Sequence, residues 1–376
     1  MVFREGKSLN KLQKLFGYGI GDFGLNIYWK TISLYLVYWY TTVVGLDPRI
    51  AGILFFIGMT WDAISDPIIA SLSERVTSRF GTYRPFLLYG SVVLGLAFVL
   101  LFWVPPLKGP QLIIYLIFAC IIFRSAYTIV AIPYAAMASR LTYDSIERAD
   151  YSGARMFCAF LGLLVVSMFL PPLVEIFSKQ SGSEQDAFKY AAGIGAIVAT
   201  TAIILCFAMT KEQPLPSQTV RSEKVWAGMI QNIRTNQSLR ILLYLIVLNT
   251  LAGTCLSLTL VFYIDSNQSS FASKEVVLTS FAIVTLIFVP IWTFLVHRYG
   301  RKKIWTVMVF IFVMNAIHML IFSSLTFNGI PVHIIIFGAC GGGFSLIIWA
   351  FIPDCVEYGQ IDSGYRSEAG VLALFL

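Results

Sequence analysis

The sequence predicts an all-α integral membrane protein made of two six-helix halves, the second of them incomplete. Three observations lead to this fold class: the composition, the series of apolar segments, and the distribution of basic residues. Of the 376 residues, 57% are hydrophobic and only 12% are charged, whereas a soluble domain carries about 25% charged residues. Most of the surface is therefore expected to face lipid. The net charge of +7 lies mostly in short loops, which indicates membrane topology and not a nucleic-acid partner.

Apolar segments long enough to cross a bilayer, about 17–25 residues each, follow one another along the chain. We expect ten complete spans, and an eleventh that begins at about Ala369 and stops at Leu376. The ten spans are expected at residues 16–41, 49–73, 85–106, 111–139, 152–175, 187–209, 237–264, 274–297, 303–325 and 330–354.

One long loop divides these spans into two groups. It is polar and basic and covers residues 211–236. Six spans, a long basic loop and further spans are typical of a secondary transporter built from two halves. We therefore expect a leader at 1–14, a six-helix half at 15–210, a linker at 211–236, and a second half at 237–376 that is truncated in its fifth span.

The basic residues predict the orientation of the spans. The leader is basic and is followed by no cleavage site, so we expect it to stay in the cytoplasm. Loops on the leader's side carry most of the lysines and arginines, including the run at 298–303, whereas the opposite loops carry five. This bias predicts a multi-pass protein of the plasma membrane, the inner membrane of a bacterium, with its N-terminus in the cytoplasm.

Two acidic residues, Asp62 and Asp66, lie in the middle of the second span. Four residues apart on a helix, their carboxylates share one face, about 40° apart and roughly 6 Å along the axis. One charge near the bilayer centre costs about 2.5–3.5 kcal/mol on insertion scales. Two charges of like sign therefore require a proton, a metal ion or a basic partner, and the pair predicts an ion site. In a simpler interpretation one Asp stays protonated and hydrogen-bonds within the bundle.

Two basic turns occupy equivalent places in the two halves. They are SERVTSRFGTYRP at residues 73–85 and VHRYGRKK at residues 296–303. Each resembles the characteristic cytoplasmic loop of the major facilitator superfamily. A single such turn is explained as a positive-inside anchor, but two of them six spans apart favour a duplicated fold.

Five further motifs resemble the glycoside–pentoside–hexuronide:cation symporters of that superfamily. They occur in that family's order, and the resemblance runs from about Leu15 to the end of the chain. The resemblance implies a transporter with twelve spans. Such a protein would import a sugar or glycoside in symport with Na⁺ or H⁺ by alternating access, and would need no other cofactor. The motifs are FGYGIGDFG (16–24), WYTTVVGL (39–46), WDAISDP (61–67), YTIVAIPY (127–134) and PDCVEYG (353–359).

The resemblance implies a cation site and a gate. The family's cation ligands correspond here to Asp62, Ser65, Asp66 and Thr128, with Asp62 and Asp66 as the metal ligands if the ion is Na⁺. Carboxylate and hydroxyl oxygens are hard ligands that suit a small cation. The family's cytoplasmic ion pair, which holds the outward-facing state closed on the inside, corresponds to Asp354 and Arg366, although a simple loop salt bridge explains the same two residues.

The first span carries a continuous polar face of three residues, Asp22, Asn26 and Lys30, which must look into the bundle or a water-filled cavity. In a well-studied member of the family, two carboxylates hold the sugar. The matching positions here are Asn26 and Ala131, so recognition of a galactoside is not carried over.

Basic residues stand near the middle of two spans instead, at Lys30 and Arg124. Either they pair with Asp62 or Asp22 and neutralise buried charge, or one faces the cavity and binds an anionic sugar such as a hexuronide or a sulfonated sugar. Arg155 resembles a sugar-site arginine of the family, and a snorkelling interfacial arginine explains it equally well.

Two tryptophans complete the predicted substrate-binding set. Trp61 and Trp349 are candidates to stack on a sugar ring, or they are packing residues. The predicted substrate site therefore comprises Asp22, Asn26, Lys30, Trp61, Arg124, Arg155 and Trp349.

Two alternatives to cation-coupled sugar import stay open: a cation-independent sugar facilitator, in which Arg124 is the permanent partner of Asp62, and a carrier of lipid-like substrates. An enzyme is not expected, because the sequence has three histidines, none in a ligand-spaced pair, and no cluster of nucleophile and base. The expected partners are a small-molecule sugar or glycoside and membrane lipids, and the protein is expected to be a monomer.

Overall fold

The computed structural model describes residues 11–76, 78–142, 144–213, 233–266, 274–321, 326–327 and 330–363. Almost every residue in these ranges is helical. The helices are α1 (Lys11–Tyr38), continued by a π-helical turn (Trp39–Val43), α2 (Pro48–Arg75), α3 (Arg84–Leu101), α4 (Pro110–Leu141), α5 (Ser145–Ser181), α6 (Glu184–Met209), α8 (Gln237–Ser266), α9 (Lys274–Tyr299), α10 (Arg301–Ile321) and α11 (Val332–Ser363). Two short strands, β1 (Thr326–Phe327) and β2 (Ile330–Pro331), pair antiparallel between α10 and α11.

Each of the ten predicted complete spans coincides with one helix. The largest differences lie at α5, which covers Ser145–Ser181 against the predicted 152–175, and at α11, which continues to Ser363. Hydropathy falls where polar residues begin, but the backbone hydrogen bonds of a helix continue beyond that point. The eleventh predicted span, and most of the linker predicted at 211–236, lie outside the described residues.

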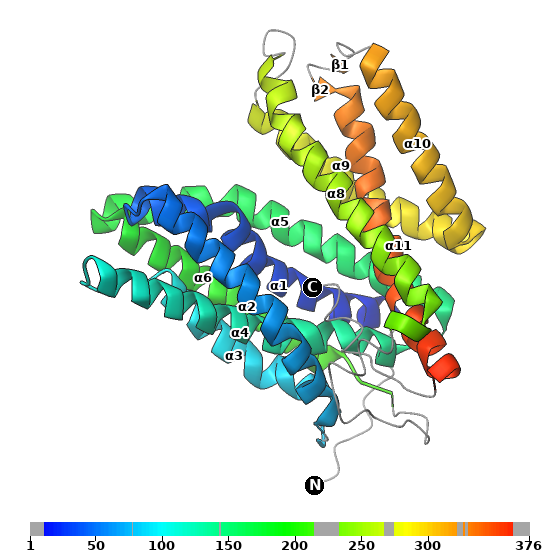
Figure 1. Ribbon diagram of the computed structural model, residues 1–376, viewed down its shortest axis with the longest axis horizontal. Coiled ribbons are helices and arrows are strands. Elements are labelled where there is room, and N and C mark those ends of the chain that lie inside the picture. The colour runs from blue at the N-terminus through cyan, green and yellow to red at the C-terminus, as the bar shows by residue number, and fades with distance from the viewer. Residues whose placement is uncertain are drawn as a thin grey trace.

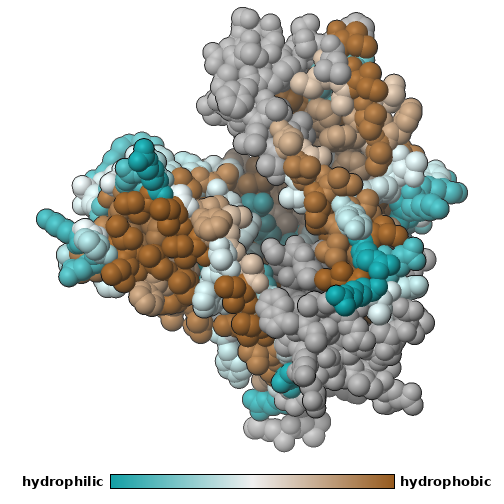
Figure 2. Space-filling model, in the orientation of Figure 1, coloured by the Kyte–Doolittle hydropathy of each residue, from teal (hydrophilic) through white to brown (hydrophobic). Residues whose placement is uncertain are grey.

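Eight of the described helices are long and apolar enough to cross a membrane: α2, α3, α4, α5, α6, α9, α10 and α11. Apolar residues cover the sides of the molecule in Figure 2, and hydrophilic residues gather at the ends. The predicted fold class is confirmed, and the protein is a multi-pass membrane protein.

The helices form two bundles, α1–α6 and α8–α11 (Figure 1). The bundles meet at one end, where α5 packs against α9 and α11, and they diverge toward the other end. A large apolar core fills the first bundle, and a smaller core joins α5 to the second. We call the end where the bundles meet the inner end, because the basic turns that the sequence assigns to the cytoplasm lie there.

The segment that follows α6 anchors the turn between α2 and α3. Gly81 in this turn has a φ of +116°, a conformation that favours glycine. The Glu212 carboxylate accepts hydrogen bonds from the backbone N–H groups of Thr82 (2.9 Å), Tyr83 (2.8 Å) and Arg84 (2.8 Å). These donors lie at the N-terminus of α3, where backbone N–H groups have no partner inside the helix and the helix dipole favours an anion.

Replacing this carboxylate should destabilise the fold. Glu212→Ala leaves three backbone donors without their acceptor, so we expect a loss of about 1–3 kcal/mol and a lower thermal unfolding temperature in detergent. Asp186→Ala is the control, because its ion pair with Lys189 is partly exposed and such pairs contribute little. Equal unfolding temperatures for Glu212→Ala and the unmodified protein would contradict this role.

Candidate transport site

A cavity of about 350 Å³ lies between the two bundles, within the size range of small-molecule sites. Its walls come from α1, α2, α4 and α5 of the first bundle and from α11 of the second. A ligand in this cavity would therefore touch both halves of the protein. The charged residues that line it are Asp22, Lys30, Asp62, Asp66 and Arg155.

Helices α2 and α4 bring their polar residues together in two steps, one helical turn apart. The Arg124 guanidinium, which is only 3% exposed, forms an ion pair with Asp62. One turn further, the Thr128 hydroxyl donates a hydrogen bond of 2.8 Å to Asp66 Oδ1. Both helices present these residues at a spacing of four, so the two contacts repeat in register.

The predicted cation ligands thus lie close together, but two of them, Ser65 and Asp62, differ in the partners of their oxygen atoms. The Ser65 hydroxyl is directed to a backbone oxygen, Asp62 O, at 3.5 Å. The second carboxylate oxygen of Asp62, Oδ1, is buried and has no hydrogen-bond partner among the described residues. In the same part of the chain, no group of three or more His, Cys, Asp or Glu side chains is arranged to hold a metal ion.

Arg155 ties three helices together at the base of the cavity. Its Nε lies 3.1 Å from Asp22 Oδ1 on α1, and its guanidinium lies 3.8 Å from the ring centre of Trp349 on α11. Helices α1 and α5 can approach this closely because Gly19 faces α5, where a Cβ would lie 2.8 Å from Ala154 O. Arg155 lines the cavity and also neutralises Asp22, so it combines a structural contact with access to a ligand.

The two basic residues of the spans have different surroundings. Arg124 is the counter-ion of Asp62 and is not among the residues that line the cavity. Lys30 lines the cavity and is half-buried, and no ion pair joins it to any described residue. The sequence allowed two interpretations of Lys30 and Arg124, pairing with a buried carboxylate or exposure to the cavity. Arg124 fits the first interpretation, and Lys30 fits the second.

The two tryptophans also differ. Trp349 lines the cavity beneath Arg155. The Trp61 indole instead donates a hydrogen bond of 2.8 Å to Ser125 Oγ on α4, and Trp61 is absent from the cavity wall. The structure therefore assigns Trp61 to the packing of α2 against α4, whereas Asn26 and Trp349 remain at the cavity.

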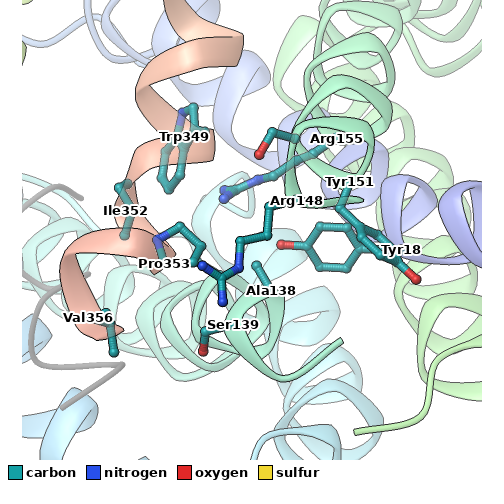
Figure 3. Close-up of a pocket in the computed structure, with 12 residues that line it drawn as sticks. Tyr18, Ala138, Ser139, Arg148, Tyr151, Arg155, Trp349, Ile352, Pro353 and Val356 are labelled. Atoms are coloured by element: carbon teal, nitrogen blue, oxygen red, sulfur yellow. The ribbon is translucent and has the colours of Figure 1, made fainter. Parts of the chain in front are cut away.

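A narrow crevice continues from the cavity toward the inner end, between α5 and α11 (Figure 3). Arg155 and Arg148 extend from α5 toward Trp349 and Pro353 of α11. The crevice has a volume of about 20 Å³, which is room for about one water molecule. The inner end is therefore closed to a sugar in this arrangement.

Ion pairs close the inner end. Arg148 of α5 pairs with Asp354 at 2.6 Å and also with Glu357, both on α11. Asp354 accepts a second contact from Arg301 at 2.6 Å. The predicted partner of Asp354, Arg366, lies outside the described residues.

A second contact between the bundles joins Asp150 of α5 to His297 of α9. Sequence reasoning did not single out Arg148, Glu357, Asp150 or His297 as gate residues. Glu357 stands in the PDCVEYG motif, and Arg148 and His297 stand beside loops assigned to the cytoplasm, so a search for opposite charges across the two halves could have found them.

A family model described as MFS/sugar transport protein matches residues 17–376. The chain belongs to this family. Its members are membrane transporters, so the protein is a sugar transporter of the major facilitator superfamily and not an enzyme, and the resemblance to glycoside symporters is confirmed at the level of the family.

Two relatives and one solved structure are similar over most of the chain. The uncharacterized symporter YnaJ of Bacillus subtilis (strain 168) is 28% identical over 100% of this chain and 80% of its own length. The glucuronide carrier protein homolog of Escherichia coli (strain K12) is 25% identical over 96% of this chain and 78% of its own. The proton:xylose symporter XylE, solved with 6-bromo-6-deoxy-D-glucose, has a TM-score of 0.62 at 13% identity, covering 97% of this chain and 84% of that chain, and supports the fold.

Neutralising Asp354 should open the inner end. Asp354→Asn weakens the contacts to Arg148 and Arg301 together. Because Asp354 is 32% exposed whereas Arg148 is buried, we expect at least about 1 kcal/mol, or an increase of at least about five-fold in the population that is open on the inside. The measurement is the rate of maleimide labelling at Ser152→Cys, in the crevice, in a background without the native cysteines.

The control for this experiment is Asp186→Asn, which removes a charge at the opposite end of the bundle. It should leave the labelling rate unchanged. If Asp354→Asn and Asp186→Asn label at the same rate, the Asp354 contacts do not hold the inner end closed.

Proposed function

We propose that the protein imports an anionic sugar or glycoside, such as a hexuronide, in symport with a proton by alternating access. One observation carries this proposal: two of the charged residues that line the cavity, one basic and one acidic, are unpaired in the described part of the chain. Asp62 is paired with Arg124 and Asp22 with Arg155. Lys30 and Asp66 have no oppositely charged partner within 4 Å among the described residues.

Lys30 supplies the proposed recognition of an anion. A half-buried ammonium group in a cavity between membrane helices is costly unless an anion approaches it. A carboxylate on the sugar would accept charge-assisted hydrogen bonds from Lys30, and Arg155 lines the same cavity from α5. The E. coli relative named as a glucuronide carrier protein homolog supports an anionic glycoside as the substrate.

Asp66 supplies the proposed coupling. It is buried, and its contact in the described structure is the neutral hydroxyl of Thr128. The Arg124 guanidinium already provides the positive charge at neighbouring Asp62, and it would repel a metal ion placed between the two carboxylates. A proton on Asp66 neutralises the carboxylate of Asp66 itself and is not exposed to that repulsion.

The two solutes then act on each other. With a proton on Asp66 the cavity has a net positive charge, which favours an anionic sugar at Lys30. By linkage, the bound sugar favours the proton equally. The loaded protein is proposed to separate α5 from α11 at the inner end and to close the opposite end, which would release both solutes into the cytoplasm.

Substitution of Lys30 tests the substrate class. We expect Lys30→Gln to lower the uptake of glucuronides relative to matching neutral glucosides by about 10- to 100-fold, the value of a charge-assisted hydrogen bond. Lys30→Arg should retain most of the preference, and Lys189→Gln, outside the cavity, should retain all of it. A preference for neutral glucosides in the unmodified protein would refute an anionic substrate.

Separate gradients test the coupling ion. In proteoliposomes, a gradient of one pH unit should drive accumulation of the sugar by up to about ten-fold, and a Na⁺ gradient should drive none. Asp66→Asn should reduce accumulation to simple equilibration, whereas Asp47→Asn, in the loop before α2, should leave it intact. Accumulation driven by Na⁺ would replace the proton with Na⁺, and gradient-independent uptake would make the protein a facilitator.

A further inference from the structure

A second cavity lies among apolar side chains of the first bundle, away from the transport site. It has a volume of about 300 Å³ and is lined by α1, α3, α5 and α6, with Phe102, Val166, Phe169 and Phe188 among its walls. The Phe169 ring is 57% exposed, so this cavity opens to the lipid side of the bundle. Thr31 contributes the polar side chain of the wall, and its hydroxyl is satisfied by Ile27 O at 2.7 Å.

A third cavity, of about 590 Å³, adjoins the second toward the end opposite the inner contacts. The two cavities share the wall residues Leu170 and Phe188, so they adjoin between α1, α5 and α6, and we call the two together the groove. The rim of the third cavity is polar, and it contains Tyr38, Glu175, Ser178, Lys179 and Glu184. The groove is therefore apolar at depth and charged at its mouth.

The dimensions of the groove match the position of a lipid in a bilayer. Leu170 and Lys179 are nine residues apart on α5, which corresponds to about 14 Å along the helix axis. Half of the hydrocarbon core of a bilayer is about 15 Å. An amphiphile with its charged group at Lys179 would place its chain beside Leu170 and deeper, along the apolar cavity.

The charges at the mouth indicate the kind of head group. Lys179 pairs with Glu175 at 2.6 Å, and Glu184 accepts a hydrogen bond of 3.2 Å from the Tyr38 hydroxyl. The rim therefore offers one ammonium group and two carboxylates. A phosphate can exchange for Glu175 at Lys179, and an ammonium group can bind Glu184, whereas the net negative charge of the rim opposes an anionic head group.

We propose that this groove binds one phospholipid with a primary ammonium head group, of the phosphatidylethanolamine class. One acyl chain occupies the apolar cavity between α5 and α6, the phosphate contacts Lys179, and the ammonium group contacts Glu184. The site is separate from the transport cavity and does not depend on which sugar or coupling ion the protein uses.

Native mass spectrometry of the full chain tests this site, with phosphatidylethanolamine, phosphatidylcholine or phosphatidylglycerol added at equal concentrations. We expect one retained phosphatidylethanolamine, at least about five-fold more occupied than either other lipid, which corresponds to one favourable charge contact at a membrane surface. Equal occupancy by phosphatidylglycerol or phosphatidylcholine would overturn the proposal.

Matched variants locate the bound lipid. Ile194→Trp fills the apolar cavity and should lower phosphatidylethanolamine occupancy to that of the other lipids, whereas Ile197→Trp, exposed on the same helix outside the cavity, should not. Glu184→Gln changes only an exposed side chain, so folding is preserved, and it should abolish the preference over phosphatidylglycerol. Unchanged preference in Glu184→Gln, or equal effects of the two tryptophan variants, would refute the site.

Discussion

The neutralisation of charge inside the membrane is the constraint on which the arrangement of the site depends. Arg124 on α4 is buried and pairs with Asp62 on α2, and Arg155 on α5 pairs with Asp22 on α1. Removing one partner of such a pair leaves an uncompensated charge in a medium of low dielectric constant, which is far costlier than losing a surface ion pair. These two contacts therefore hold four helices of the first bundle around the cavity, and they determine which charges stay available to a ligand.

Charge is also neutralised at the inner end, but there the ion pair joins the two halves. The Arg148 side chain is 2% exposed, close to the 3% of Arg124, whereas its partner Asp354 is 32% exposed. Arg301 on α10 contacts Asp354 from within the second bundle, so this carboxylate keeps a basic partner when the halves separate. A transporter that alternates between two states needs such an arrangement, because the contacts between its halves must separate while the contacts within each half persist. Arg155 stands at the boundary, since it bonds within the first bundle and touches Trp349 of the second through its ring face.

Much of the fold was predictable, because hydropathy reports directly on the segments that a bilayer can accept. The ten helices agree with the predicted spans, and the resemblance to the family's cation site placed Asp66 and Thr128 together, as the structure does. The partners of Asp354 and the packing role of Trp61 were not predictable in the same way. They depend on which faces of distant helices meet, and the hydropathy of one helix does not identify the helix that packs against it.

The sequence by itself therefore determined the membrane fold, the order of the spans and the presence of acidic and basic residues at the depth of the cavity. Only the tertiary structure decided which of those charged residues form ion pairs and which face the cavity. Lys30 and Arg124 are equivalent candidates in the sequence. In the structure Lys30 lines the cavity, whereas Arg124 forms an ion pair with Asp62. The physical reason is that burial and pairing are properties of several helices packed together, whereas composition and periodicity describe each helix alone.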